Sequence, residues 1–179
     1  MTRLVVVSGD PGEFCGYGIS SFDCKLLLKE GLVGGLRSLR GAYGQFRLGS
    51  TTANVDRHLE IARYAFENLC DEDDLFVLVQ ESFQLRMLSS EPSLLEPVRF
   101  NAVLVDRLAG VEEDARPVLE WQTPSDAKSS INDARLNLWG QSERTRGKDH
   151  AKDAQRHGYY YARRWASDGA VRYRSGWDG

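Results

Sequence analysis

The sequence predicts a single α/β domain in which a mixed β-sheet is flanked by α-helices. Three observations predict it: short apolar strand patterns cluster near the N-terminus, strand and helix patterns then alternate, and 179 residues suit one domain. Hydrophobic residues make up 41% of the chain and charged residues 27%, which is typical of a globular protein. We expect one domain over residues 1–166, followed by a flexible, glycine-rich tail over residues 167–179.

The N-terminal third predicts three antiparallel strands. Residues 4–8 form a β-branched apolar run that Gly-Asp-Pro-Gly ends, which is typical of a buried strand followed by a turn. Residues 16–22 predict a second strand paired with the first. A weaker pattern over residues 36–48, with glycines at 41 and 44, predicts a third.

Helices and strands alternate in the rest of the chain. The clearest helix has one apolar stripe at steps of three and four residues, formed by Val55, Leu59, Ala62, Phe66 and Leu69. Its other faces carry charges, and His58 is expected at the surface. The later elements are a buried strand at 75–79, a helix at 94–108 with Pro97 in its first turn, a strand at 118–121, a loop containing Pro124, a short helix at 131–139, and a mobile loop at 141–148.

A last helix over residues 149–166 completes the pattern. Its expected packing face comprises Ala151, Ala154, Gly158, Tyr161 and Trp165. The resulting order, three strands followed by α-β-α-β-α, matches a ribonuclease H-like arrangement, an α/β fold with a mixed sheet flanked by helices.

Composition and motifs exclude several classes of protein. No run of about 18 apolar residues predicts a membrane span, and the first apolar run is too short for a secretory signal. The three cysteines have neither disulfide nor metal-type spacing, so a reducing cytoplasm is the expected location. The sequence also lacks a GxxxxGK[ST] loop, which disfavours an ATP-driven motor.

The net charge of −3 conceals an asymmetry along the chain. Residues 1–128 hold 13 Lys/Arg against 20 Asp/Glu, a net charge of −7, whereas residues 129–179 hold 10 against 6, a net charge of +4. Seven Trp and Tyr residues lie in the basic part. Basic and aromatic side chains together suit a phosphate backbone with unstacked bases, and a solvated C-terminal tail is the alternative.

Four polar residues form the candidate catalytic group. Asp10 directly follows the first buried strand, and Glu81 follows the later one at 75–79. His150 and Asp153 are three residues apart on the last helix and therefore share a face. If the two strands are neighbours, three carboxylates and a histidine can converge on one spot, although each alone is also typical of a turn, a strand end or a solvated pair.

Such a cluster of carboxylates would repel itself unless cations neutralised it. Hard divalent ions that prefer oxygen ligands, Mg²⁺ or Mn²⁺, are the natural partners. Two of these ions about 3.5–4 Å apart can activate a water and stabilise the leaving oxygen of a phosphodiester. The expected chemistry is therefore hydrolysis of nucleic acid, leaving 5′-phosphate and 3′-hydroxyl ends.

Three segments resemble RuvC-like Holliday-junction resolvases. The segment DPGEFCGYGIS resembles the DPG and GYG opening of that family. The segment QTPSDAKSSINDARLNLWG resembles the family's loop of proline, lysine and following helix, especially in the phage-borne branch. The segment DHAKDAQRHG resembles the family's closing His/Asp-x-x-Asp-Ala motif. The resemblance implies that Asp10, Glu81, His150 and Asp153 bind metal and act in catalysis, and that Lys128 lies near the scissile phosphate. It also implies a homodimer that cuts two strands of a four-way DNA junction.

Several assignments stay open at this point. Asp149 stands beside His150 and could replace it as the third ligand. His157 follows Asp153 by one helical turn, and either assists the pair or is a buried structural histidine. Candidate phosphate contacts, besides Lys128, are Arg144, Arg146, Lys148 and Lys152.

The leading hypothesis is a Mg²⁺-dependent endodeoxyribonuclease acting on branched DNA. A non-catalytic scaffold that uses the same fold to bind DNA or protein is one alternative. A nuclease for flaps or RNA–DNA hybrids is the other.

Overall fold

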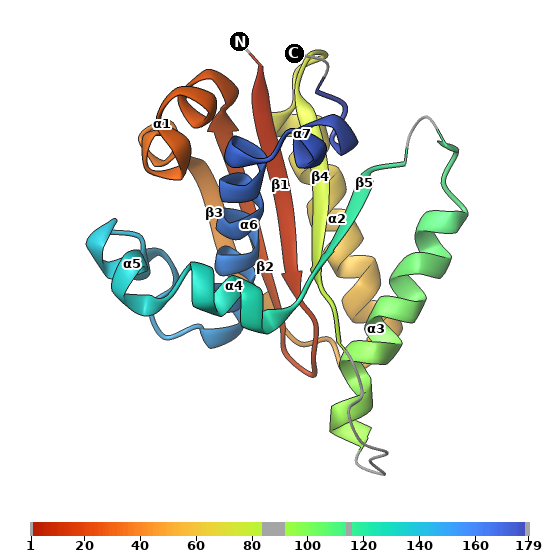
Figure 1. Cartoon of the computed structure of the whole chain (residues 1–179). Coiled ribbons are helices and arrows are strands. Elements are labelled where there is room, and N and C mark those ends of the chain that lie inside the picture. The colour runs from red at the N-terminus through yellow and green to blue at the C-terminus, as the bar shows by residue number, and fades with distance from the viewer. Residues whose placement is uncertain (1, 84–91, 114–115, 178–179) are drawn as a thin grey trace.

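The computed structural model describes residues 2–83, 92–113 and 116–177. Its elements follow in the order β1 (Arg3–Asp10), β2 (Cys15–Asp23), α1 (Cys24–Leu36), β3 (Arg40–Phe46), α2 (Thr51–Leu69), β4 (Leu75–Glu81), α3 (Pro92–Ala109), β5 (Val118–Gln122), α4 (Pro124–Ser130), α5 (Asp133–Leu138), the 3₁₀ turn η2 (Ser142–Thr145), α6 (Asp149–Ser167) and α7 (Gly169–Arg174) (Figure 1).

The five strands form one mixed sheet in the order β3-β2-β1-β4-β5. β1 pairs antiparallel with β2 and parallel with β4, and β4 pairs parallel with β5. The register aligns Gly9 with Gln80 and Glu81 with Gln122. The carboxyl ends of β1, β4 and β5 therefore meet at one edge of the sheet.

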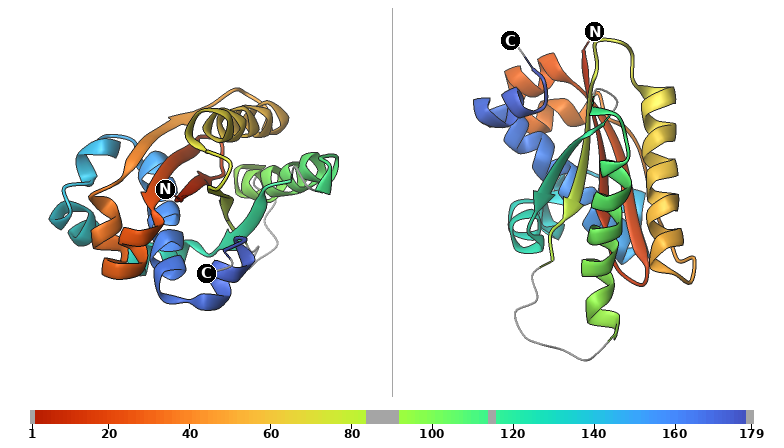
Figure 2. Two further views of the ribbon diagram at one scale, coloured as in Figure 1. Left: turned by 90° about the horizontal axis from the view of Figure 1, so that it is seen from above. Right: turned by 90° about the vertical axis from the view of Figure 1, so that its right-hand side faces the viewer.

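Helices cover both faces of this sheet, with α2 and α3 on one side and α1, α6 and α7 on the other (Figure 2). Side chains alternate between the faces along a strand. Val6 of β1 and Val77 of β4 accordingly belong to the core beneath α6, whereas Val7 and Leu78 belong to the core beneath α2 and α3. The expected α/β class, a mixed sheet flanked by helices, is confirmed.

Before α6, two helices occur where none was expected. α1 lies between β2 and β3, so the first three strands are not joined as a simple meander. The carboxylate of Asp23 caps α1, accepting hydrogen bonds from the backbone of Lys25 and Leu26, and the helix kinks at Gly31, where φ is +66°. α4 replaces the expected loop after β5, because Pro124 occupies its first turn and Thr123 caps it.

The buried face of α2 differs from the expected stripe. Val55 and Ala62 are buried, but Phe66 is 56% exposed and His58 is completely buried, so its expected surface position is wrong. His58 is tolerated in the core because its Nε2 hydrogen-bonds the side chain of Gln80 on β4. Burial lowers the pKa of His58 to about 4, so the ring is neutral at physiological pH.

α3 begins before residue 94, so Pro97 lies in its second turn and not its first. Further along the chain, residues 149–166 form a helix as expected. The packing face predicted for α6 is buried throughout, with Ala151, Ala154, Tyr161 and Trp165 at 0% exposure.

As far as residue 177, the segment after α6 is not the flexible tail that the sequence predicts. It forms α7, whose Val171 is fully buried. Trp165 Nε1 donates a hydrogen bond to Ser175 Oγ at 2.9 Å, and Trp177 packs edge-to-face on the same indole. These contacts anchor the segment.

The aromatic residues of the basic C-terminal part belong mostly to the core. Tyr159, Tyr161 and Trp165 have no exposed surface, so they cannot stack on nucleic-acid bases, whereas Tyr173 is 77% exposed. No helix within the described residues is both long enough and apolar enough to span a membrane.

Candidate active site

Asp10 and Glu81 end two adjacent parallel strands on the face that α6 covers. Asp10 follows Val6 and Ser8 on alternate positions of β1, and Glu81 follows Val77 and Val79 on β4. Since Val6, Val77 and Val79 belong to the core beneath α6, both carboxylates face that helix. They are 7% and 9% exposed.

α6 approaches the sheet closely enough to bring its own polar side chains to this edge. Gly16 of β2 lies directly against the backbone at His150, where even a Cβ would overlap the carbonyl group. Ser8 Oγ donates a 2.7 Å hydrogen bond to the carbonyl of Ala154. The small Ala151 is fully buried at the same contact, which is why the first turns of α6 can sit beside Asp10.

The first direct contact joins Asp10 to His150. Nδ1 of His150 lies 2.8 Å from Oδ2 of Asp10, although the two residues are 140 positions apart. Asp149, the alternative third ligand, has a side chain that is 94% exposed and pairs with Lys152 at 3.9 Å. The geometry therefore favours His150 over Asp149 as the partner of Asp10.

The pKa of Asp10 is shifted by burial and by the charged groups around it. Burial raises the pKa of Asp10 from 3.8 to about 6; the hydrogen bond with His150 opposes this rise, and the negative charges of Glu81 and Asp153 add to it. The same hydrogen bond raises the pKa of His150. Glu81, His150 and Asp153 therefore all lie within electrostatic reach of Asp10.

Asp153 is held by two basic side chains. Lys128 Nζ lies 2.9 Å from its Oδ2, and Arg156 pairs with its Oδ1. The hydrogen bond to Asp153 raises the pKa of Lys128, and Glu81 and Asp10 add smaller electrostatic contributions in the same direction. Lys128, which belongs to α4, thus lies beside the acidic group.

Glu81 contacts His157, for which the sequence leaves two roles open: assisting the catalytic pair, or serving as a buried structural histidine. His157 Nε2 lies 3.1 Å from Glu81 Oε2, and His157 Nδ1 lies 3.0 Å from Oε1 of Gln122. Sequence reasoning missed Gln122 and Arg156. Gln122 ends β5 as Glu81 ends β4, and Arg156 follows Asp153 by three residues, so strand-end and helical spacing could have identified both.

The other basic candidates are dispersed. Arg144 reaches the carbonyl of Gly41 in β3, Arg146 pairs with Glu143 in its own turn, and Lys152 lies 3.8 Å from Asp133. Lys148 is exposed at the start of α6. These four side chains surround the first turns of α6 and do not converge on the carboxylates.

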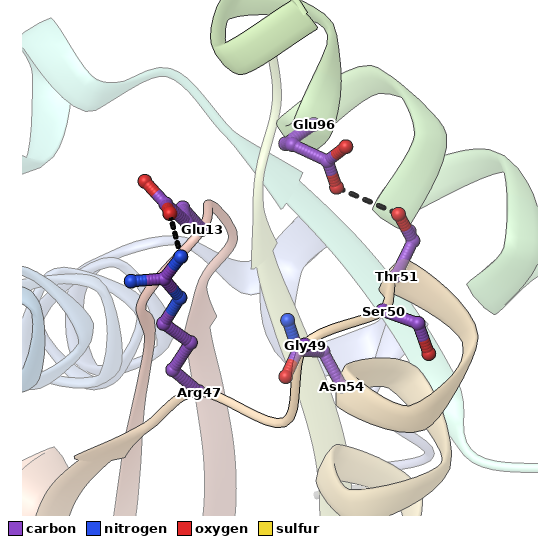
Figure 3. A pocket seen from close by; sticks show the side chains of 7 residues that line it. All are labelled: Glu13, Arg47, Gly49, Ser50, Thr51, Asn54 and Glu96. Carbon is purple, nitrogen blue, oxygen red and sulfur yellow. Dashed lines mark hydrogen bonds and ion pairs between the residues drawn. The ribbon is translucent and has the colours of Figure 1, made fainter.

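A pocket of about 440 Å³ lies near the acidic group, and its lining residues are Glu13, Arg47, Gly49, Ser50, Thr51, Asn54 and Glu96 (Figure 3). Arg47 pairs with Glu13, and Thr51 donates a 2.6 Å hydrogen bond to Glu96. Phe14 connects the two regions, because its ring lies beneath Arg47 and stacks on His150 with centroids 6.1 Å apart. The four candidate catalytic residues do not line this pocket.

The donor chemistry of the acidic group fits hard divalent ions. Three carboxylates and one imidazole supply oxygen and nitrogen ligands. Burial, and then the negative charges of Glu81 and Asp153, raise the pKa of Asp10, and a bound cation would offset both effects. As the side chains stand, the described part of the chain contains no group of three or more His, Cys, Asp or Glu residues spaced to hold an ion. Basic side chains and histidines partner the acidic ones instead.

Comparison with known proteins bears on the fold. No protein-family model and no curated protein sequence matches this chain. Among solved structures it is similar to Thermus thermophilus RuvC in complex with a Holliday-junction substrate, with a TM-score of 0.58 and 14% identity over 92% of this chain and 96% of that one. A second structure of Thermus thermophilus RuvC matches with a TM-score of 0.55 and 12% identity, over 89% of this chain and 94% of that one.

The yeast mitochondrial Holliday-junction resolvase Ydc2 is similar as well. It matches with a TM-score of 0.50 and 13% identity, over 96% of this chain and 81% of that one. Identities this low report the fold and carry no residue roles. The chain has the ribonuclease H-like fold of the RuvC-like Holliday-junction resolvases.

Proposed function

We propose that this protein is a metal-dependent endonuclease that hydrolyses phosphodiester bonds in branched DNA, with the four-way junction as its substrate. One observation carries the proposal: Asp10 and Glu81 end adjacent parallel strands beneath α6, and Glu81 together with His150 and Asp153 of that helix lies within electrostatic reach of Asp10. The likeness to RuvC, solved with a Holliday-junction substrate, supports branched DNA as the substrate class.

The four residues would hold two Mg²⁺ or Mn²⁺ ions. Such ions, when bound, supply an activated water and stabilise the leaving oxygen. His150 uses Nδ1 toward Asp10, which leaves Nε2 as a ring nitrogen that can bind metal. Burial of Asp10 and Glu81 limits their movement, so these oxygens are held in place before the substrate arrives.

Lys128 has two tasks in this proposal. Its ammonium group fixes Asp153 at 2.9 Å, and half of its side chain surface is exposed, so it can also contact a phosphate. A positive group beside the phosphate stabilises the negative charge that develops there in the transition state. Arg144, Arg146, Lys148 and Lys152 would contact the DNA backbone around the start of α6, and a homodimer would present two such sites to one junction.

The decisive experiment compares cleavage of a synthetic four-way junction, a linear duplex, a flap and an RNA–DNA hybrid, with and without Mg²⁺. We expect cleavage of the junction, loss of cleavage in EDTA, and loss in both Asp10→Asn and His150→Ala. Asp149→Asn should retain cleavage because that side chain points into solvent. Cleavage by Asp10→Asn would show that the metal site is misassigned, and a preference for flap or hybrid would change the substrate.

A second candidate function has one observation in its favour. Each acidic side chain of the group already has a basic or histidine partner, so every carboxylate of the group is paired without metal. This arrangement would suit a non-catalytic scaffold that binds DNA or a protein. Junction binding with no cleavage of any of the four substrates in Mg²⁺ or Mn²⁺ would favour the scaffold.

A further inference from the structure

His157 is the most enclosed polar side chain at the candidate active site. It is 1% exposed, and the two residues that its ring contacts, Glu81 and Gln122, are also buried. These two partners stand side by side in the sheet, because Glu81 and Gln122 are aligned in the β4-β5 register. One imidazole from α6 thus contacts two adjacent strand ends.

The chemistry of the partners fixes how the ring is used. An ionised carboxylate only accepts hydrogen bonds, so His157 Nε2 carries the hydrogen and donates it to Glu81 Oε2 across 3.1 Å. This contact engages one carboxylate oxygen and leaves Oε1 for another ligand.

The far side of the ring is held as well. Nδ1 faces the Gln122 amide at 3.0 Å, while the amide nitrogen of Gln122 is buried without a partner among the described residues. Turning that amide over would let its nitrogen donate to Nδ1 while Nε2 donates to Glu81. In either orientation Gln122 restrains the ring that holds Glu81.

We propose that His157 is a positioning residue that holds the Glu81 carboxylate in the orientation in which it binds a divalent ion, with Gln122 orienting the imidazole from β5. The inference rests on the proposed function and extends it to a residue that the sequence motifs do not assign. Without the restraint, the negative charge of Asp10 nearby would favour rotation of Glu81 away from the common site. Hydrogen-bond partners that orient metal-binding side chains contribute about 10–100-fold in metal affinity or activity.

Three substitutions separate positioning from mere packing. His157→Gln places an amide nitrogen near the position of Nε2, so it keeps the bond to Glu81. His157→Asn reaches only the position of Nδ1 and loses that bond, and His157→Leu loses both bonds while roughly filling the space. A packing role would give similar losses for Gln and Asn, whereas a positioning role makes Gln the variant that restores function.

The measurement is Mn²⁺ binding to the whole 179-residue chain without DNA, detected by calorimetry and by the electron paramagnetic resonance signal of free Mn²⁺. We expect His157→Asn and His157→Leu to bind Mn²⁺ about 10–100-fold more weakly than the unmodified protein, and His157→Gln to stay within a few-fold of it. In junction cleavage kcat should fall in the same order. Junction affinity without divalent ions should not change, since the His157 side chain is buried and offers no surface to a ligand.

His58→Asn is the matched control. His58 is an equally buried histidine that contacts a glutamine of the same strand, β4, but it belongs to α2, on the other face of the sheet. We expect its substitution to lower the free energy of unfolding and to leave Mn²⁺ affinity unchanged. If the His157 variants do not fold, Gln122→Leu makes the same test from the strand side, with the same expected direction.

The results separate this inference from the proposed function. Wild-type Mn²⁺ affinity in His157→Asn and His157→Leu, or equal losses in all three His157 variants, overturns the positioning role while the nuclease remains. If the unmodified protein neither binds Mn²⁺ nor cleaves any DNA, the proposed function and this inference are both wrong.

Discussion

Removal of the buried negative charge at Asp10 should stabilise the metal-free protein while it abolishes cleavage. The carboxyl is 7% exposed, and burial raises its pKa from 3.8 to about 6, with Glu81 and Asp153 adding repulsion. The folded protein therefore binds a proton at Asp10 more tightly than the unfolded chain does. This contribution favours folding below pH 3.8 and is lost as the pH rises through about 6.

The magnitude follows from the difference between the two pKa values. About two pKa units at 1.36 kcal/mol each amount to up to about 3 kcal/mol of destabilisation by the ionised carboxylate at pH 7.5. Asp10→Asn keeps the shape and still accepts a hydrogen bond from His150, but it carries no charge. The lost attraction to His150 opposes the gain, which makes 3 kcal/mol an upper value.

The assay is urea unfolding in EDTA at pH 5.0 and pH 7.5. We expect Asp10→Asn to be more stable than the unmodified protein at pH 7.5, by a midpoint shift of roughly 1 M urea, and the difference to shrink at pH 5.0. Glu67→Gln, which removes an exposed carboxylate paired with Arg63 at 3.6 Å, should change stability by less than about 1 kcal/mol. Added Mn²⁺ should then stabilise the unmodified protein and not Asp10→Asn.

Two outcomes would show that the buried charge of Asp10 does not destabilise the protein. One is an Asp10→Asn variant that is less stable than the unmodified protein at pH 7.5. The other is a stability difference that does not depend on pH, because a charge effect must disappear as the carboxyl becomes protonated.

Three further substitutions test the packing and the chemistry of the site. Gly16→Ala would place a methyl group on the backbone of His150. We expect this change to lower the free energy of unfolding by about 1–3 kcal/mol and to remove most of the cleavage activity. Full activity would contradict the close approach of α6 to the sheet. Trp165→Ala should cost about 3–5 kcal/mol in urea unfolding, because the indole is fully buried and packs on Trp177, and a loss below 1 kcal/mol would mean that α7 is not docked. Lys128→Met should lower kcat about a hundredfold or more and leave junction affinity nearly unchanged, and a change in affinity alone would limit Lys128 to DNA binding.

Local pattern accounts for much of the fold. The β-branched run before Asp10 and the apolar run before Glu81 both form buried strands, because continuous apolar stretches of that length suit a sheet covered on both faces. The small-residue face of α6 is buried as its spacing predicts. The positions of Asp10 and Glu81 at the carboxyl ends of strands follow from the sequence for the same reason.

Elements whose stability comes from distant partners were missed. α1 contains three glycines and no amphipathic stripe, so its sequence does not predict a helix, although the Asp23 cap was visible. His58 has a polar side chain on a helix of mixed composition, and its burial depends on Gln80 across the sheet. α7 is short, and its docking depends on Trp165, which precedes it on another helix.

The candidate site divides in the same way. Residue types and their spacing by themselves determined which side chains can bind metal, since carboxylates at strand ends and a His-x-x-Asp pair on a helix are local features. Tertiary structure alone decided the partners: His150 with Asp10, His157 with Glu81, and Lys128 with Asp153. Each pair joins segments that are 25 to 140 residues apart, and such contacts depend on how α6 lies across the sheet, which no local pattern of residues encodes.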